Sequence, residues 1–271
     1  HGLHPTSVED CLDSEHLPKY ERIGDLNFAI LRAYDLQAAM DADTVQELTR
    51  KVALFYRGDF LLTIHRVDHP YLARLREKWR TIAPTTPHAL TEILTDLLES
   101  VLHSYERPID DGLNEIESLE MSVFGAAGAK TFQIQQGYIV KRKASVFKRM
   151  IRSCLDILPK LGLDPQSPHT QNLHEAADNL FFYAEALMES SNTLLTLHRS
   201  MASQQTNEVM RVLTIFSIFL LPLNVITGIY GMNFEHMPEL KAPWGYPAAL
   251  SAMVAVLALV YTGLRRKGWL K

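Results

Sequence analysis

The sequence predicts a mostly α-helical membrane protein with a small α/β domain, a long helical hairpin and a stalk helix continuous with the first of two transmembrane helices. Three observations lead to this fold class. Residues 212–234 and residues 244–264 contain no Asp, Glu, Lys, Arg or His, and each run exceeds the roughly 20 residues that cross a bilayer. No Pro or Gly interrupts the chain between His169 and Leu221, so one helix extends into the first run.

The chain begins with a polar segment instead of a signal peptide. Residues 1–20 lack both a starting Met and a short apolar run, so we expect the beginning of the first domain to be missing. Cys11 and Cys154 do not have metal-ligand spacing and are predicted to be reduced structural thiols. The net charge of −4 identifies no partner.

The first domain is predicted to cover residues 1–87, as the C-terminal part of a cytoplasmic α/β domain. Residues 27–34 and 51–66 are rich in β-branched and aromatic residues and predict strands, with a turn at residues 57–59. Helix propensity prevails from Tyr71 onward. The order of elements therefore predicts strands followed by helices.

Residues 88–168 are predicted to form a cytoplasmic helical hairpin. Apolar spacing of three and four predicts a helix over 88–123, the two glycines at 125 and 128 predict a break, and a second helix covers 130–161. Residues 88–128 hold nine acidic residues and one basic residue, whereas residues 129–161 hold eight basic residues and one acidic residue. Either the two helices face each other with opposite charges, or each charged face is solvated.

The remaining chain predicts a stalk helix (169–211), a first span (212–234), an external loop (235–243), a second span (244–264) and a basic tail (265–271). Basic flanks remain in the cytoplasm, and Arg211 precedes the first span while Arg265, Arg266 and Lys267 follow the second. Both termini are therefore expected to be cytoplasmic.

A stripe of small and polar residues follows one face of the first span. Steps of three and four connect Asn207, Met210, Thr214, Ser217, Leu221, Asn224, Gly228 and Gly231. Polar groups within a span need protein or water around them. The stripe therefore predicts a bundle axis or a water-filled pore, and a tight contact between two helices through small residues would also explain it.

The end of this span carries a motif that identifies a family. Tyr-Gly-Met-Asn at residues 230–233, together with residues 206–215, Pro222 and residues 234–240, resembles the CorA family of metal transporters. Trp244-Gly-Tyr-Pro and the basic tail extend the similarity, which is dense from about residue 203 onward and looser before it.

The resemblance implies a funnel-shaped homopentamer in a bacterial inner membrane that conducts Mg²⁺, and also Co²⁺ or Ni²⁺, between its first spans. Gly231, Met232 and Asn233 would form a selectivity mouth that holds the hydrated ion through neutral oxygens, since Mg²⁺ gives up its water reluctantly. Glu235 and Glu239 would add external acidic rings. The pore-lining set is Asn207, Met210, Leu213, Thr214, Ser217, Leu221, Asn224 and Gly228, of which Met210, Leu213 and Leu221 resemble hydrophobic constrictions, and Arg265, Arg266 and Lys267 would form a basic collar.

The regulatory metal site of the family is altered in this chain. Family members sense cytoplasmic Mg²⁺ through two carboxylates, and Asn172 and Ala73 occupy the matching positions here. Glu175, Asp178 and Asp68 are the candidate substitutes. His65 and His69 have the spacing of a zinc pair on a helix, but His65 ends a predicted strand and Pro70 follows His69.

Other functions explain less of the sequence. A Zn²⁺ transporter of the same superfamily shares the motif, whereas a non-conducting membrane scaffold would explain the spans but not the motif. No catalytic motif predicts an enzyme, and nothing beyond a basic stretch suggests nucleic-acid binding. The expected partners are copies of the same chain, the lipid bilayer and divalent metal ions.

Overall fold

The computed structural model describes residues 4–13, 16–58, 60–82, 89–124, 134–233, 237–238 and 242–269. It divides the chain into two compact units, His1–His198 and Arg199–Lys271, and each is described separately below.

The first unit contains a four-stranded antiparallel sheet whose strands follow one another in space as in the chain. Its strands are β1 (Lys19–Ile23), β2 (Leu26–Tyr34), β3 (Thr49–Arg57) and β4 (Phe60–His65). The predicted strands correspond to β2, β3 and β4, and the predicted turn lies at Gly58, whose φ of +48° suits a residue without a side chain. Asp59 lies outside the described residues. β1 was not predicted from the sequence.

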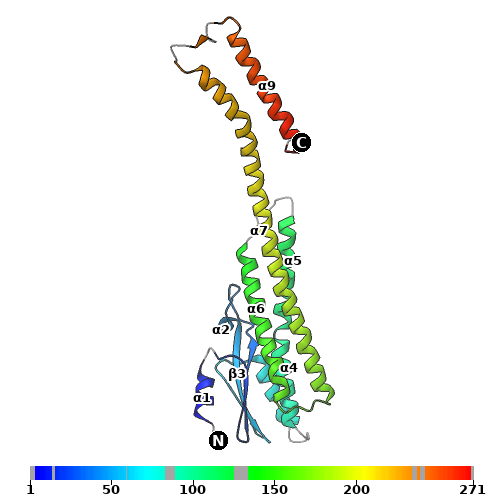
Figure 1. Ribbon diagram of the computed structural model, residues 1–271. Helices are drawn as coiled ribbons and strands as arrows, with labels where there is room; N and C mark the ends of the chain where they lie inside the picture. The colour runs from blue at the N-terminus through cyan, green and yellow to red at the C-terminus, as the bar shows by residue number, and fades with distance from the viewer. Residues whose placement is uncertain are drawn as a thin grey trace. The chain divides into compact units, whose positions relative to one another are not determined.

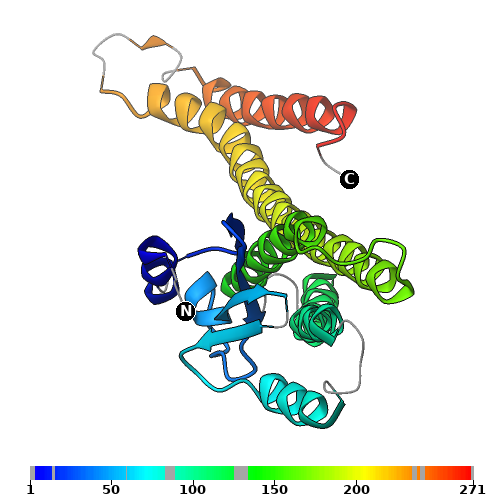
Figure 2. The same cartoon turned by 90° about the horizontal axis from the view of Figure 1, so that it is seen from below.

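The two faces of the sheet have different covers (Figures 1 and 2). Leu31 and Leu54 point to the larger core, which also contains Leu97, Phe147 and Leu173 from the helices. The opposite face carries Phe28, Ile30 and Phe55, which pack with Cys11 of the short helix α1 (Pro5–Leu12). The strict alternation along each strand therefore places helices on one face and α1 on the other.

Two further short helices connect the strands to the helical part. α2 (Val45–Leu48) begins with a capping box in which Thr44 and Glu47 satisfy each other's backbone N–H groups. α3 (Pro70–Ile82) begins close to the predicted position and packs beside α4.

The helix predicted over residues 88–123 is two helices, so this prediction was wrong in its continuity. α4 (Ala89–His103) ends and α5 (Glu106–Phe124) begins around Ser104 and Tyr105. The Ser104 hydroxyl donates to Val101 O at 2.6 Å and accepts from Tyr34 N at 2.9 Å, which ties the break to the sheet. Pro108, which fits the first turn of a helix but not its interior, is the sequence signal for this break.

The basic helix is α6 (Ile134–Ile157), followed by a short 3₁₀ turn, η3 (Leu158–Lys160), where the prolines predicted its end. The glycine break lies outside the described residues. α5 runs in the same direction as the first part of α7 (Pro168–Tyr230), since Ile109 lies beside Leu180 and Gly112 beside Leu187. α6 runs in the opposite direction, with Arg152 over Phe181 and Lys148 Nζ 2.6 Å from Glu185 Oε1.

The second unit contains the rest of α7 and the helix α9 (Gly245–Arg266), which returns beside the end of α7 (Figures 1 and 2). Both helices are long and apolar enough to cross a membrane. α7 has 63 residues, which confirms the single long helix predicted from the absence of Pro and Gly before Pro222.

Candidate ion pathway

Hydroxyl groups on the second half of α7 are satisfied by the helix itself. Thr214 Oγ1 donates to Met210 O at 2.7 Å, Ser217 Oγ to Leu213 O at 2.9 Å and Thr227 Oγ1 to Leu223 O at 3.0 Å. A hydroxyl that bonds to the preceding turn needs no other partner in an apolar environment. Of these residues, Thr214 and Ser217 lie on the stripe and make it small and mildly polar at little cost.

The side-chain amides on and just after this half of α7 are different. Within the described part of the chain, no hydrogen bond is formed by the amides of Asn207, Asn224 or Asn233, and all three residues are exposed. Burying a polar group without a hydrogen-bond partner costs about 2–7 kcal/mol of free energy, and this penalty applies to an amide that faces hydrocarbon. These amides therefore require water, an ion or another protein chain.

Large apolar side chains lie between the amides. Met210, Leu213 and Leu221 are 55%, 56% and 62% exposed in the single chain. Partly buried side chains gather elsewhere on α7, at Ile215, Ile218, Phe219, Pro222 and Ile226. Because each residue turns about 100° around a helix, this partly buried face is roughly opposite the stripe. Two small residues of the stripe itself, Thr214 and Ser217, are also partly buried. Most of the stripe thus belongs to the open side of α7, which also includes exposed neighbours such as Val209 and Phe216.

The stripe ends where α7 ends. Gly231 N donates to Thr227 O at 2.9 Å and Met232 N to Ile229 O at 3.3 Å, so the last turn tightens after Tyr230. A Cβ on Gly231 would lie 3.0 Å from Thr227 O, tighter than ordinary contact. The carbonyl end of a helix carries a partial negative charge that favours cations. Gly231 was predicted to lie in the mouth, and the structure puts this residue directly after the last residue of α7.

The remaining predicted transport residues lie at the ends of the second unit's helices or outside the described residues. Glu235 and Glu239 are outside the described residues, so the external acidic rings stay a prediction. Arg265 and Arg266 are exposed in the last turn of α9, and Lys267 N donates to Gly263 O at 3.2 Å, which caps the helix.

The candidate regulatory acids are not brought together within one chain. Asp68, Glu175 and Asp178 are all exposed, and Asp68 Oδ1 is 4.0 Å from His65 Nδ1. Among the residues that the structure describes, no group of three or more His, Cys, Asp or Glu side chains could hold a metal. The rings of His65 and His69 are 6.1 Å apart, and His69 is buried while His65 ends β4, as expected. A regulatory role for these acids stays a prediction.

The two charged helices do not pair with each other as the facing arrangement requires. In the described ranges, the ion pairs of α6 join Arg142 to Asp43, Lys148 to Glu185 and Arg152 to Asp156. On α5, Asp111 lies 3.7 Å from Arg107. The solvated alternative describes these faces better.

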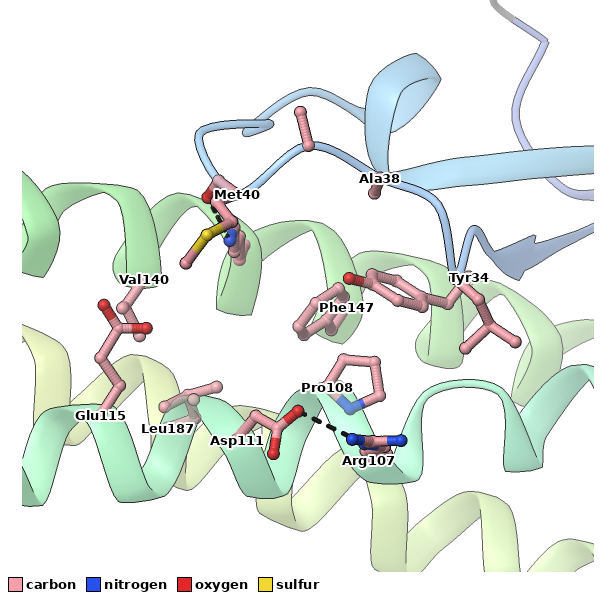
Figure 3. Close-up of a pocket in the computed structure, with 14 residues that line it drawn as sticks. Tyr34, Ala38, Met40, Arg107, Pro108, Asp111, Glu115, Val140, Phe147 and Leu187 are labelled. Atoms are coloured by element: carbon pink, nitrogen blue, oxygen red, sulfur yellow. Dashed lines mark hydrogen bonds and ion pairs between the residues drawn. The ribbon is translucent and has the colours of Figure 1, made fainter.

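Between α5, α6 and the segment after β2 lies a cavity of about 520 Å³ (Figure 3). The carboxylates of Asp111 and Glu115 line it together with Tyr34 and Phe147, and Lys143 Nζ donates to Met40 O at 2.7 Å at its edge. Opposite charges thus share this cavity without direct contact between the acids of α5 and Lys143.

The chain matches the family described as CorA-like Mg²⁺ transporter protein over residues 1–266. It is 30% identical over 282 residues to the cobalt/magnesium transport protein CorA of Thermotoga maritima, which covers 99% of this chain and 77% of that protein.

Solved structures share the fold. The CorA magnesium transporter of Methanocaldococcus jannaschii superimposes with a TM-score of 0.75 at 22% identity, over 99% of this chain and 85% of that one. The full-length CmaX protein superimposes with a TM-score of 0.73 at 18% identity, over 98% of this chain and 81% of that one. From the match over nearly its whole length, the chain belongs to the CorA-like Mg²⁺ transporter family.

Proposed function

We propose that this protein is one subunit of a homopentameric channel for divalent cations, with the stripe of α7 lining the ion path. The single observation that carries the proposal is the open face of α7, which presents partnerless amides and large apolar side chains in register. Copies of the same face around an axis would cover Met210, Leu213 and Leu221 and give the amides water or ions as partners.

The transported ions follow from the chemistry of the mouth and from the named relatives. Neutral oxygens from Asn233 and the end of α7 suit a hydrated Mg²⁺ ion, which keeps most of its water. The relative from T. maritima is named a cobalt/magnesium transport protein. We therefore assign Mg²⁺ and Co²⁺ as substrates, with Ni²⁺ as a further one.

The membrane arrangement is part of the same proposal. Both spans lie in the inner membrane, the first unit and both termini are cytoplasmic, and Glu235 and Glu239 form acidic rings outside. The basic residues Arg265, Arg266 and Lys267 form a collar on the cytoplasmic side, as the distribution of basic flanks requires.

Replacement of Asn233 by Ala tests the mouth. It should abolish saturable Mg²⁺ uptake into proteoliposomes without changing the oligomer, because each subunit loses its amide oxygen at the mouth. Asn179→Ala, an exposed asparagine of α7 in the first unit, is the matched control. Uptake of wild-type magnitude by an Asn233→Ala protein of normal size would refute the assignment.

Two measurements separate the alternatives. Fivefold symmetry in single-particle images of the detergent-solubilised protein distinguishes the channel from a membrane scaffold of another stoichiometry. Uptake compared for Mg²⁺, Co²⁺, Ni²⁺ and Zn²⁺ in the same vesicles identifies the ion, and uptake of Zn²⁺ alone would place the protein with zinc transporters.

A further inference from the structure

Three cations lie side by side on the face of the sheet that α1 covers. Arg32 of β2 is paired in register with Lys51 of β3, and Val52 is paired with His65, so Arg66 follows as the next neighbour of Lys51. Neighbouring strands are about 4.8 Å apart, so the three side chains form one row across three strands. We call Arg32, Lys51 and Arg66 the cation row.

Like charges directly opposite each other destabilise a sheet unless something compensates them. In this row, several donors are positioned by carbonyl and hydroxyl oxygens. Arg32 donates to Thr49 Oγ1 at 2.7 Å and to His16 O at 3.0 Å, Lys51 Nζ donates to Asp10 O at 2.7 Å, and Arg66 donates to Leu12 O at 3.1 Å. Backbone carbonyls at the end of α1 position these cations but do not remove their charge.

The row lines a cavity of about 250 Å³. The other residues that line it include Gln46, Thr49 and Arg50, and among the described residues no Asp or Glu lines it. Arg50 is matched by Asp35, at 2.6 Å from its guanidinium, and Asp13 at the end of α1 is the acid whose charge acts on Arg32 and Lys51. The described lining of the cavity thus carries an excess of positive charge.

The electrostatics of Lys51 agree with this excess. Burial lowers the pKa of Lys51, and the charges of Arg32 and Arg66 act in the same direction, against the opposing effects of Cys11 and Asp13. A bound anion would reverse that effect and stabilise all three cations together.

We propose that this cavity is a binding site for a small dianionic oxyanion of the phosphate class. A tetrahedral oxyanion offers several acceptor oxygens at once, which suits donors that approach from three adjacent strands, and charge-assisted hydrogen bonds are about twice as strong as neutral ones. A guanidinium group binds such oxyanions well because of its fork geometry, and Arg66 is the exposed arginine of the row, with Nη2 donating to Leu12 O. Gln46 supplies a neutral donor at the rim. A bound anion would also fasten the end of α1 to β3 and β4.

Titration calorimetry of the full chain in detergent tests the proposal. Inorganic phosphate and pyrophosphate are titrated separately in Mg²⁺-free buffer, with chloride present at constant ionic strength. We expect saturable binding of one anion per subunit, weakened about tenfold or more when both Lys51 and Arg66 are changed to Gln. Lys51→Arg, which keeps the charge, should retain binding.

The matched control removes the same charge elsewhere. Arg57→Gln with Arg80→Gln changes two exposed arginines outside the cavity and should leave binding unchanged. If the variant with both Lys51 and Arg66 changed does not fold, Arg66→Gln alone replaces it in the test. This single change should not disturb folding, because Arg66 is exposed and lies beyond the end of β4. Absence of saturable phosphate binding by the wild type, or equal weakening by the control variant, would overturn the site.

Discussion

Leu213 is an exposed apolar side chain between self-satisfied hydroxyls and free amides on α7. In a pore it would lie at a constriction that excludes water when the channel is closed. An amide at this position would hold water in the constriction. We therefore expect Leu213→Asn to raise the basal leak of Mg²⁺ from loaded proteoliposomes several-fold.

Two substitutions control for this effect. Leu213→Val keeps the constriction apolar and should not leak, and Ile215→Asn puts the same amide on the partly buried face of α7. If Leu213→Asn leaks no more than these two, Leu213 has a packing role only.

His69 is a buried residue with an unusual titration. Burial, followed by the charge of His65, lowers the pKa of His69 below its ordinary value of 6.5, and its Nε2 has no partner within the described residues. Below about pH 6.5 the unfolded chain binds a proton that the folded chain does not, so stability falls as the pH drops toward the folded pKa. Each unit of depression contributes about 1.4 kcal/mol.

His69→Phe should therefore make the protein less sensitive to acid. Phenylalanine keeps the ring that packs 5.0 Å from Tyr71 and removes the titrating group. The difference between the thermal unfolding midpoints at about pH 7.5 and about pH 5.5 should shrink in this variant, and not in His174→Gln. An unchanged difference would mean that His69 is protonated as easily in the folded protein as in the unfolded one.

At the scale of elements, helix packing in the first unit depends on the glycine in α5. A Cβ at Gly112 would lie 2.8 Å from Leu187 Cδ2, and Leu187 is fully buried. Gly112→Val should thus lower the unfolding midpoint by overpacking, which typically costs about 1–3 kcal/mol.

A double variant tests the contact directly. Leu187→Ala alone should destabilise by about 2–5 kcal/mol through its cavity, while the combination with Gly112→Val should cost less than the sum because each change relieves the other. Additive effects in thermal unfolding of the detergent-solubilised protein would show that the two positions do not interact.

Elements with strong local signals were predictable from the sequence. β2, β3 and the long α7 follow from apolar runs and from missing Pro and Gly. β1 is Lys-Tyr-Glu-Arg-Ile, whose polar residues suit an edge strand, so only its pairing with β2 defines it. The break between α4 and α5 depends on Tyr105, whose hydroxyl donates to Arg32 O at 2.7 Å, a contact far away in the sequence.

The candidate site was predictable to a different degree. The spacing of the α7 stripe was visible in the sequence because it depends on helical periodicity alone. The cation row was not, since it requires the register between β2 and β3 and the position of α1. Whether Asp68, Glu175 and Asp178 meet could not be predicted either, because in the proposed oligomer it would depend on contacts between copies of the chain.

At the scale of the whole molecule, charge is separated between helices. The acids of α5 face solvent or the cavity of Figure 3, instead of the basic residues of α6. We expect this negative charge to favour cations against the predicted collar of Arg265, Arg266 and Lys267.

Conversion of the α5 acids to amides tests this expectation. The variant changes Asp110, Asp111, Glu115 and Glu117. Because salt screens charges beyond about 10 Å at 0.1 M, Mg²⁺ flux should fall at low ionic strength and remain near the wild-type value at high ionic strength. The same change of flux at both salt concentrations would point to a structural effect. No change at either concentration would show that the charge of the α5 acids does not influence Mg²⁺ flux.

The placement of both apolar helices after the first unit has a consequence for biosynthesis. At roughly 5–20 residues per second, a ribosome needs on the order of ten seconds or more to make the approximately 200 residues before them, longer than many domains need to fold. The first unit can thus be folded when the hydrophobic half of α7 emerges, and a folded body does not pass through a translocation pore. Under the proposed topology, folding order would then keep this unit on the side where it was synthesised, and the basic flanks would act in the same direction.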